Sequence, residues 1–162
     1  MAFDAFIKIP GVDGESKRKG FEKQIEIHSF SLGAANPTTI GHGGGGGAGK
    51  VSISSFSFMK KSDITSPVLF QKCCEGEHFD KVTVTLNKAG GKAPVDFLKY
   101  EFEQVYVNSI QWSGSSGGDD TPHESVSLDF GKVSVTYTGQ NPDGTKGATK
   151  VGQWDLMAVA SS

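Results

Sequence analysis

The stretch from Gly43 to Lys50 reads GGGGGAGK, and its spacing suggests chemistry more directly than any other part of the sequence. Gly44, Gly49 and Lys50 match the G-x-x-x-x-G-K pattern of a phosphate-binding P-loop, in which backbone N–H groups and a lysine hold nucleotide phosphates. If the pattern forms such a loop, the protein binds a nucleotide and hydrolyses it.

The residues on both sides of this stretch argue against a P-loop. The motif needs a buried strand before it and a helix after it, because the helix N-terminus completes the anion site. Here residues 36–42 read as a loop or short edge strand, and residues 51–58 alternate as a strand. Val51 stands where the motif has the serine or threonine that holds magnesium. A long glycine loop that has another purpose is therefore favoured.

Other residues that could do chemistry are scattered along the chain. Cys73, Cys74 and His78 form a partial zinc set without a fourth ligand, so core packing by the cysteines is favoured. Asp119-Asp120 is typical of a solvated turn. We therefore predict no catalytic residue, no cofactor and no metal, and we interpret the protein as a non-enzyme. No histidine has a partner at metal-ligand spacing among His28, His42, His78 and His123.

The net charge and the lack of long apolar runs argue against two classes of partner, nucleic acids and membranes. The net charge is −2, and the short basic cluster at residues 17–19 lies beside Asp13 and Glu15, so we expect no nucleic acid. No apolar run approaches the length of a membrane span.

The adjacent pair Cys73-Cys74 offers no disulfide framework, and Asp4 and Lys8 interrupt the apolar N-terminus. We expect synthesis in a reducing cytoplasm, and any export by a route that uses no signal peptide.

Most of the sequence alternates with period two, which is typical of strands with one buried face. The apolar parity changes at two places: from Val126–Phe130 to Val133 across Gly131, and between residues 51–53 and 56–58. A bulge or bend must absorb each change, and such bends curl a sheet into a barrel or a coiled sandwich. Alternation is clearest at residues 3–9, 25–27, 82–86, 126–130 and 133–137.

One helix is predicted near residues 66–76. Ser66 can cap it, Pro67 suits the first helical position, and Gly76 suits a left-handed C-terminal cap after Lys72. An apolar stripe on this helix could lie on the sheet or plug a barrel end, and it consists of Leu69, Phe70, Cys73 and Cys74.

The ordered motifs resemble the Hcp family, the tube-forming proteins of bacterial type VI secretion systems. The resemblance covers almost the whole chain and combines segments that are each weak alone. They are FDAFIKI at residues 3–9 with GES at 14–16, the glycine loop running into Val51, FMKK at 58–61, LNKAGG at 86–91, SGSSGG at 113–118, and ESVSL at 124–128 continuing to Tyr137.

The resemblance implies a mainly β fold over residues 1–162, a single domain with a two-sheet β-barrel, one helix beside it and long glycine-rich loops. It implies homo-hexameric rings that stack into a tube inside a contractile sheath, with a spike protein at the tip. Small effectors could travel in the ring lumen. We also expect no fused toxin domain, so this copy would be the structural form.

Two segments are candidates for assembly. Ser29 and Ser31 continue the parity of Ile25 and Ile27, so a polar strand end could line a pore, although a simple bulge would give the same pattern. By the resemblance, the loop at residues 36–50 contacts neighbouring subunits or the adjoining ring. The loop residues we select for that contact are Asn36, Thr39, His42, Gly45, Gly47 and Lys50.

Three functions compete at this point. A structural, secreted tube subunit is favoured. The alternative is a β-barrel binding module or chaperone that holds a small secreted partner without polymerising. A nucleotide-dependent enzyme rests on the glycine stretch alone.

Overall fold

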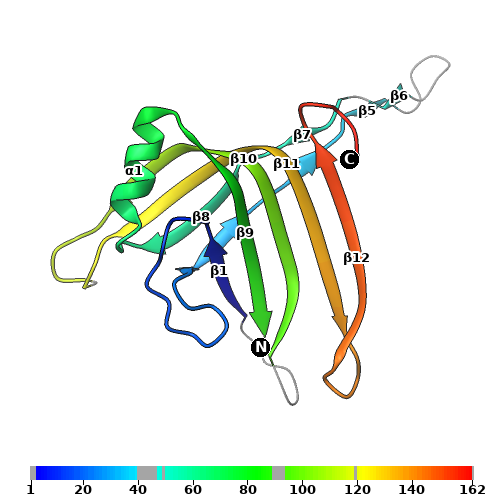
Figure 1. Ribbon diagram of the computed structural model, residues 1–162. Coiled ribbons are helices and arrows are strands. Elements are labelled where there is room, and N and C mark those ends of the chain that lie inside the picture. Colours follow the sequence, from blue (N-terminus) through cyan, green and yellow to red (C-terminus); the bar gives the residue numbers. More distant parts are fainter. Residues whose placement is uncertain (1–2, 40–46, 49, 89–93, 119, 162) are drawn as a thin grey trace.

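The computed structural model describes residues 3–39, 47–48, 50–88, 94–118 and 120–161, and Figure 1 shows their arrangement. The predicted mainly β fold with one helix is confirmed. A curled sheet forms the body, α1 packs against one end of it, and short strand pairs extend from the opposite end. The strands are β1 (Asp4–Lys8), β2 (Ile25–Ile27), β3 (Ser29–Ser31), β4 (Ala34–Ala35), β5 (Thr38–Thr39), β6 (Gly47–Ala48), β7 (Ser52–Ile53), β8 (Phe56–Lys61), β9 (His78–Lys88), β10 (Val95–Ser113), β11 (His123–Gln140) and β12 (Lys146–Asp155).

All the pairings in the described residues are antiparallel. The main sheet has the order β2-β1-β9-β10-β11-β8-β3, with β12 paired to the second half of β11. The pairs β4-β7 and β5-β6 are separate and form the extension at upper right in Figure 1.

The long strands β10 and β11 serve two layers of the fold. The first half of β10 pairs with β9, and its last residues, after Tyr106, pair with β11 alone among the described pairings. β11 pairs first with β8 and then, beyond Gly131, with β12. One layer is therefore β1, β9, β10, β11 and β12, and the other is β3, β8 and the opposite ends of β10 and β11.

Bends in these strands confirm the parity change predicted at Gly131. Gln104 has a φ of 52° and lies opposite Gly131, between the pairs Glu103–Lys132 and Val105–Phe130. A second irregularity lies between Val107 and Ser109. The pairing register is continuous across the bend at Gln104, whereas the irregularity after Val107 is a bulge that adds one residue to β10. Together they let the apolar side chains keep facing the core while the sheet turns.

The expected barrel is not closed by hydrogen bonds in the part of the chain that the structure describes. β2 and β3 end the sheet path, and both belong to one continuous segment that is interrupted at His28. The N–H of His28 donates to the carbonyl oxygen of Met59, over 2.8 Å, so the segment leaves β1 and joins β8 at this point. The chain itself, rather than a strand ladder, connects the two ends of the sheet.

The core lies between the two layers and is rich in aromatic side chains. Phe56 and Phe102 are fully buried, with ring centroids 5.1 Å apart. Burying each such ring stabilises the fold by about 1.5–3 kcal/mol relative to exposure. Other fully or almost fully buried members are Ile7, Ile25, Phe58, Leu69, Val82, Val84, Val105, Val126 and Leu128.

Helix α1 spans Ser66–Glu75, as predicted to within a residue. Gly76 ends it with a φ of 68°, and its N–H donates to the carbonyl of Lys72, which confirms the predicted C-terminal cap. The predicted N-cap was wrong: Thr65 is the N-cap residue, and Ser66 is already helical. The Asp63 carboxylate accepts from the Thr65 N–H instead, so an acidic side chain supports this end of the helix.

Candidate functional site

A serine-rich surface covers the outer side of the layer formed by β3, β8, β11 and β10. Two rows of directly paired residues cross these four strands. The first row is Ser31–Ser57–Ser127–Ser109, and the second is Ser29–Met59–Ser125–Gln111. We call these eight residues the serine face. No residue in either row carries a charge.

The serine face follows from alternation along each strand. Phe56, Phe58 and Val126 point into the core, so the serines between them point outward. The hydroxyls of Ser57 and Ser127 lie 2.9 Å apart across the strand pair, within hydrogen-bond distance. The face therefore presents small groups that donate and accept hydrogen bonds without an electric field of one sign.

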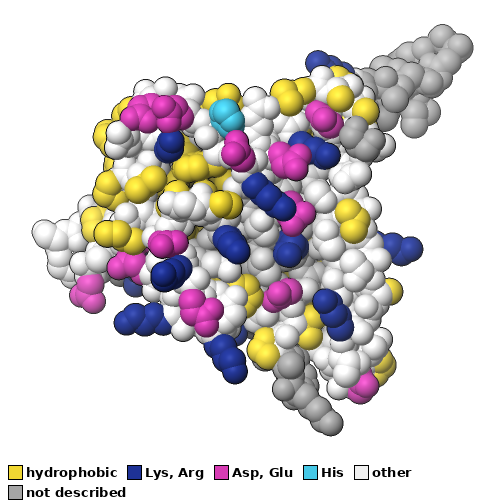
Figure 2. All heavy atoms as spheres, viewed as in Figure 1, with side chains coloured by type: hydrophobic (Ala, Val, Ile, Leu, Met, Phe, Trp, Pro, Cys, Tyr) yellow, Lys and Arg dark blue, Asp and Glu magenta, His cyan; other side chains and the backbone are white. Residues whose placement is uncertain are grey.

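The outer side of the other layer differs in charge. Lys81–Glu103–Lys132–Asp155 form one row across β9, β10, β11 and β12, with Glu101 in the next row. Nζ of Lys81 lies 3.7 Å from Glu101, and Nζ of Lys132 lies 3.9 Å from Glu103. We call this the charged face, and Figure 2 shows basic and acidic side chains interspersed on the visible side of the molecule.

The predicted assembly residues are only partly placed by the structure. Ser29 and Ser31 are exposed and share the serine face, and their position in a pore stays a prediction. Thr39 of β5 pairs with Gly47 of β6, and Asn36 and Lys50 are exposed. His42 and Gly45 lie outside the described residues. After Lys50 the chain enters strand β7 rather than a helix, so the context that a P-loop requires is missing.

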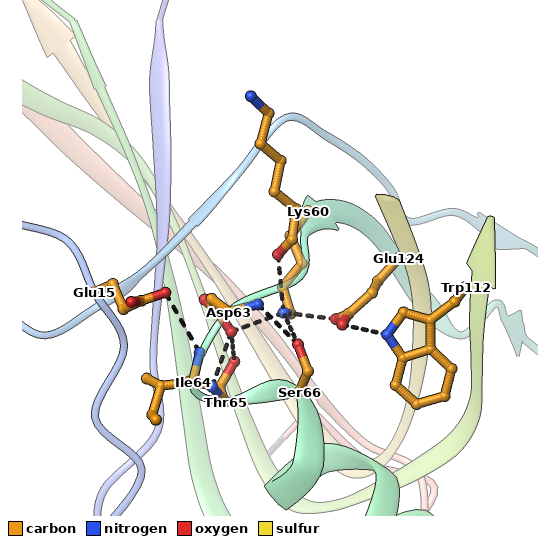
Figure 3. Close-up of polar contacts among 9 residues, drawn as sticks. Glu15, Lys60, Asp63, Ile64, Thr65, Ser66, Trp112 and Glu124 are labelled. Carbon is orange, nitrogen blue, oxygen red and sulfur yellow. Dashed lines mark hydrogen bonds and ion pairs between the residues drawn. The ribbon is translucent and has the colours of Figure 1, made fainter. Parts of the chain in front are cut away.

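A buried charged cluster joins β8, β11 and the start of α1 (Figure 3). Lys60 and Glu124 are directly paired residues of adjacent strands, both are 0% exposed, and Nζ lies 2.6 Å from Oε2. The same ammonium group donates to Asp63 over 2.9 Å and to the Ser66 hydroxyl over 3.2 Å. It thereby ties the beginning of the helix to the sheet.

Trp112 completes this cluster at the end of β10. Its indole Nε1 donates to Oε1 of Glu124 over 2.5 Å, so both carboxylate oxygens of Glu124 are engaged. Charges buried without partners cost several kcal/mol, and the attraction between Lys60 and Glu124 offsets this cost. Sequence reasoning missed the cluster, although Lys60 shares the parity of Phe56 and Phe58, and Glu124 shares that of Val126.

Histidines that are distant in sequence come together at the junction of β2, β3 and β11. The rings of His28 and His123 are 6.3 Å apart, a proximity that the sequence did not reveal. Among the residues that the structure places, no group of three or more histidine, cysteine or acidic residues is arranged to hold a metal ion. Nor does any helix in that part of the chain have the length and apolar character needed to cross a bilayer.

Three ionisable groups, Lys72, Glu77 and Tyr100, have perturbed pKa values. The hydrogen bond from Lys72 lowers the pKa of Glu77 and raises that of Lys72, over a 2.6 Å contact beside the helix end. Burial between the layers raises the pKa of the Tyr100 phenol. The contact between Lys72 and Glu77 lies on the surface, whereas the Tyr100 phenol is partly buried between the layers.

The comparisons with known proteins agree along the whole chain. A family model described as "Type VI secretion system effector, Hcp" matches residues 6–137. The chain is 40% identical to "Protein hcp1" of Pseudomonas aeruginosa over 158 residues, which is 96% of each sequence. A solved "type six secretion system protein" superposes with a TM-score of 0.93 at 31% identity, covering 99% of this chain and 100% of the other.

A second solved structure supports the same assignment. Hcp1 from Salmonella typhimurium has a TM-score of 0.82 and 31% identity, with 100% of both chains covered. The similarity in sequence and in fold therefore extends well beyond the short motifs that carry the resemblance. The chain belongs to the Hcp family of type VI secretion proteins.

Proposed function

We propose that this protein is a structural subunit of the type VI secretion inner tube. Six copies form a ring with an open centre, rings stack, and a contractile sheath expels the tube behind a spike protein. Family membership supports the secretion system, and the serine face is the observation of this chain that supports a subunit with a pore wall.

The serine face has the chemistry expected of a pore wall, with Ser29 and Ser31 in the lumen. Its rows carry hydroxyl and amide groups and one methionine, and none of the eight residues is charged. A water-filled passage lined in this way stays hydrated and attracts neither acidic nor basic cargo strongly. Small effectors would therefore be held weakly enough to be released.

The extension formed by β4–β7 and β5–β6 is the part that we assign to contacts between copies or between rings. It projects from the body at the end far from α1 (Figure 1). Asn36, Thr39, His42, Gly45, Gly47 and Lys50 are the residues proposed to make these contacts. In this proposal the protein is made in the cytoplasm, leaves without a signal peptide, and has no catalytic activity or cofactor.

Oligomeric state is the first test of this function. Light scattering after size exclusion should give six times the subunit mass of 17.1 kDa, and negative-stain images should show rings with open centres. A monomer over a wide concentration range would contradict the proposal. It would favour a β-barrel adaptor or chaperone that holds one small partner.

Cysteine labelling tests the position of the serine face within the ring. Ser31→Cys, in a background without Cys73 and Cys74, should react with a bulky maleimide much more slowly in rings than in monomers. Thr136→Cys is the control and should not show that difference: Thr136 lies four residues after Lys132 on the same side of β11, in the layer of the charged face, and is partly exposed. Equal protection of both sites, or of neither, would contradict a lumen position for Ser31.

A further inference from the structure

An exposed aromatic pair stands at the α1 end of the molecule. Phe70 of α1 and Trp112 of β10 have ring centroids 5.6 Å apart, and they remain 48% and 41% exposed. Hydrophobic side chains gather around the helix in Figure 2. The predicted apolar stripe is thus divided: Leu69 is buried against the sheet, whereas Phe70 is half exposed. Exposed aromatic pairs of this kind are typical anchors of protein interfaces.

The buried charged cluster holds this pair in place. Glu124 accepts from the Trp112 indole, and Lys60 fixes Glu124 while also binding Ser66 at the start of the helix that carries Phe70. Both aromatic residues are therefore positioned before any partner arrives. An anchor that is ordered in advance loses little conformational entropy on docking.

An apolar groove of about 350 Å³ opens at the other end of the molecule. Its walls come from the chain after β3, from β7, and from β10, β11 and β12, where the two layers separate. Side chains such as Tyr100 and Val133 line it, and none of the described residues around it is charged. An apolar occupant suits this groove, because a charged one would lose its hydration without a partner.

The pair and the groove flank opposite ends of the serine face. Trp112 directly follows Gln111, the β10 end of one row, whereas the groove residues Leu32 and Gly33 follow Ser31, the β3 end of the other row. In Figure 1, α1 lies at the left and β7 and β12 at the right. A contact between the two features is possible only between different copies, and a head-to-tail contact of this type generates a closed ring when the rotation allows it.

We propose that Phe70 and Trp112 of one copy insert into the groove of the next copy and form the contact that closes the ring. Lys60 and Glu124 are positioning residues for this contact. The inference rests on the proposed ring function and specifies its interface. It commits the groove to a second copy of this chain, and a small apolar ligand or a segment of another protein is the alternative occupant.

Two variants disable the two sides separately. Phe70→Asp places a charge on the exposed aromatic pair and leaves the buried face of α1 intact. Gly152→Arg fills the groove: Gly152 lines it, and a Cβ added there meets no atom within 4 Å. Val68→Asp and Val151→Asp are controls, because both side chains are exposed, at 38% and 61%, and neither belongs to the pair or the groove. Circular dichroism and thermal unfolding check that all four variants fold.

We expect each disabling variant to be monomeric while both controls form rings. An equimolar mixture of Phe70→Asp and Gly152→Arg retains one intact pair and one intact groove. The mixture should give a heterodimer of twice the 17.1 kDa subunit mass, and nothing larger, in native mass spectrometry. This complementation separates a head-to-tail contact from a general loss of solubility or fold.

Four outcomes would overturn the inference. Rings in either disabling variant would show that the pair or the groove is not needed. A mixture that stays monomeric would show that the two features do not meet. A co-purified small molecule that is lost in Gly152→Arg while rings persist would assign the groove to a ligand. A monomeric wild type would remove the proposed function itself, whereas the first three outcomes leave it standing.

Discussion

The serine face and the charged face differ although the same two strands build much of both. β10 and β11 contribute Ser109, Gln111, Ser125 and Ser127 to one face, and Glu101, Glu103 and Lys132 to the other. The bends near Gln104 and Gly131 separate these stretches. The difference therefore lies in the outward side chains and not in the type of element, which indicates that each layer meets a different environment.

Buried and exposed ion pairs in the two layers should respond very differently to mutation. Lys60→Met should lower the free energy of unfolding by about 3–5 kcal/mol, because Glu124 loses its partner inside the protein. Lys81→Met on the charged face should change it by less than about 0.5 kcal/mol, because that pair is solvated. Chemical denaturation measures both values.

A double variant identifies the source of the Lys60 effect. Lys60→Met with Glu124→Leu removes both charges and should recover a large part of the lost stability. If Lys60→Met alone costs less than about 1 kcal/mol, the cluster does not behave as a buried ion pair. Equal losses at Lys60 and Lys81 would remove the contrast between the two layers.

Added charge tests whether only one face meets other copies around a pore. Ser31→Glu and Thr136→Glu should each leave the stability of the isolated domain within about 0.5 kcal/mol of wild type, because Ser31 is exposed and Thr136 is partly exposed. Only Ser31→Glu should weaken rings, most strongly at low salt, because like charges then surround one passage. Light scattering at low and high salt measures this. Equal weakening by both variants would contradict different roles for the faces.

The sequence predicted the features that depend on local pattern. Alternation located the strands on either side of Gly131, and the Pro67–Gly76 signals located α1. Contacts between distant segments were not predictable in this way, because a strand pattern does not name its neighbour. The pair Lys60–Glu124 and the approach of His28 to His123 are of this kind.

Part of the candidate site could have been found by extending the parity argument. Serines occur at alternate positions in residues 29–31, 55–57 and 125–127, each opposite in parity to buried aromatic or aliphatic residues. The sequence pattern predicted only Ser29 and Ser31 as pore-lining residues. The register that aligns them with Ser57 and Ser127 depends on the order of strands in the sheet, which the sequence does not show. The groove needed both layers in place and had no sequence signal.

Tyr100 offers a pH readout at the opening between the two layers. Burial already raises its pKa, and filling the groove with another copy should raise it further. Because the folded pKa is raised, the protonated Tyr100 phenol contributes to the free energy of unfolding. This contribution is fully present below the unfolded tyrosine pKa of about 10 and is lost as the pH rises through the folded pKa. With Tyr106 and Tyr137 replaced by phenylalanine, absorbance should show ionisation at higher pH in rings than in monomeric Phe70→Asp. Identical titrations would mean that the groove stays open in the ring.

The smallest effect is expected at the bend that separates the two faces. Gln104 has a φ of 52°, a conformation that costs a residue with a side chain about 1–2 kcal/mol and costs glycine little. Gln104→Gly removes that cost but increases the freedom of the unfolded chain, so we expect a net gain in unfolding free energy of about 0.5 kcal/mol. Lys99→Gly, in the same strand but with ordinary strand geometry, should instead lose about 0.5–1 kcal/mol. If the two glycine variants change the unfolding free energy with opposite signs, the bend, rather than strand propensity, governs position 104. Equal losses in both variants would instead show that the Gln104 side chain stabilises the turn between the faces.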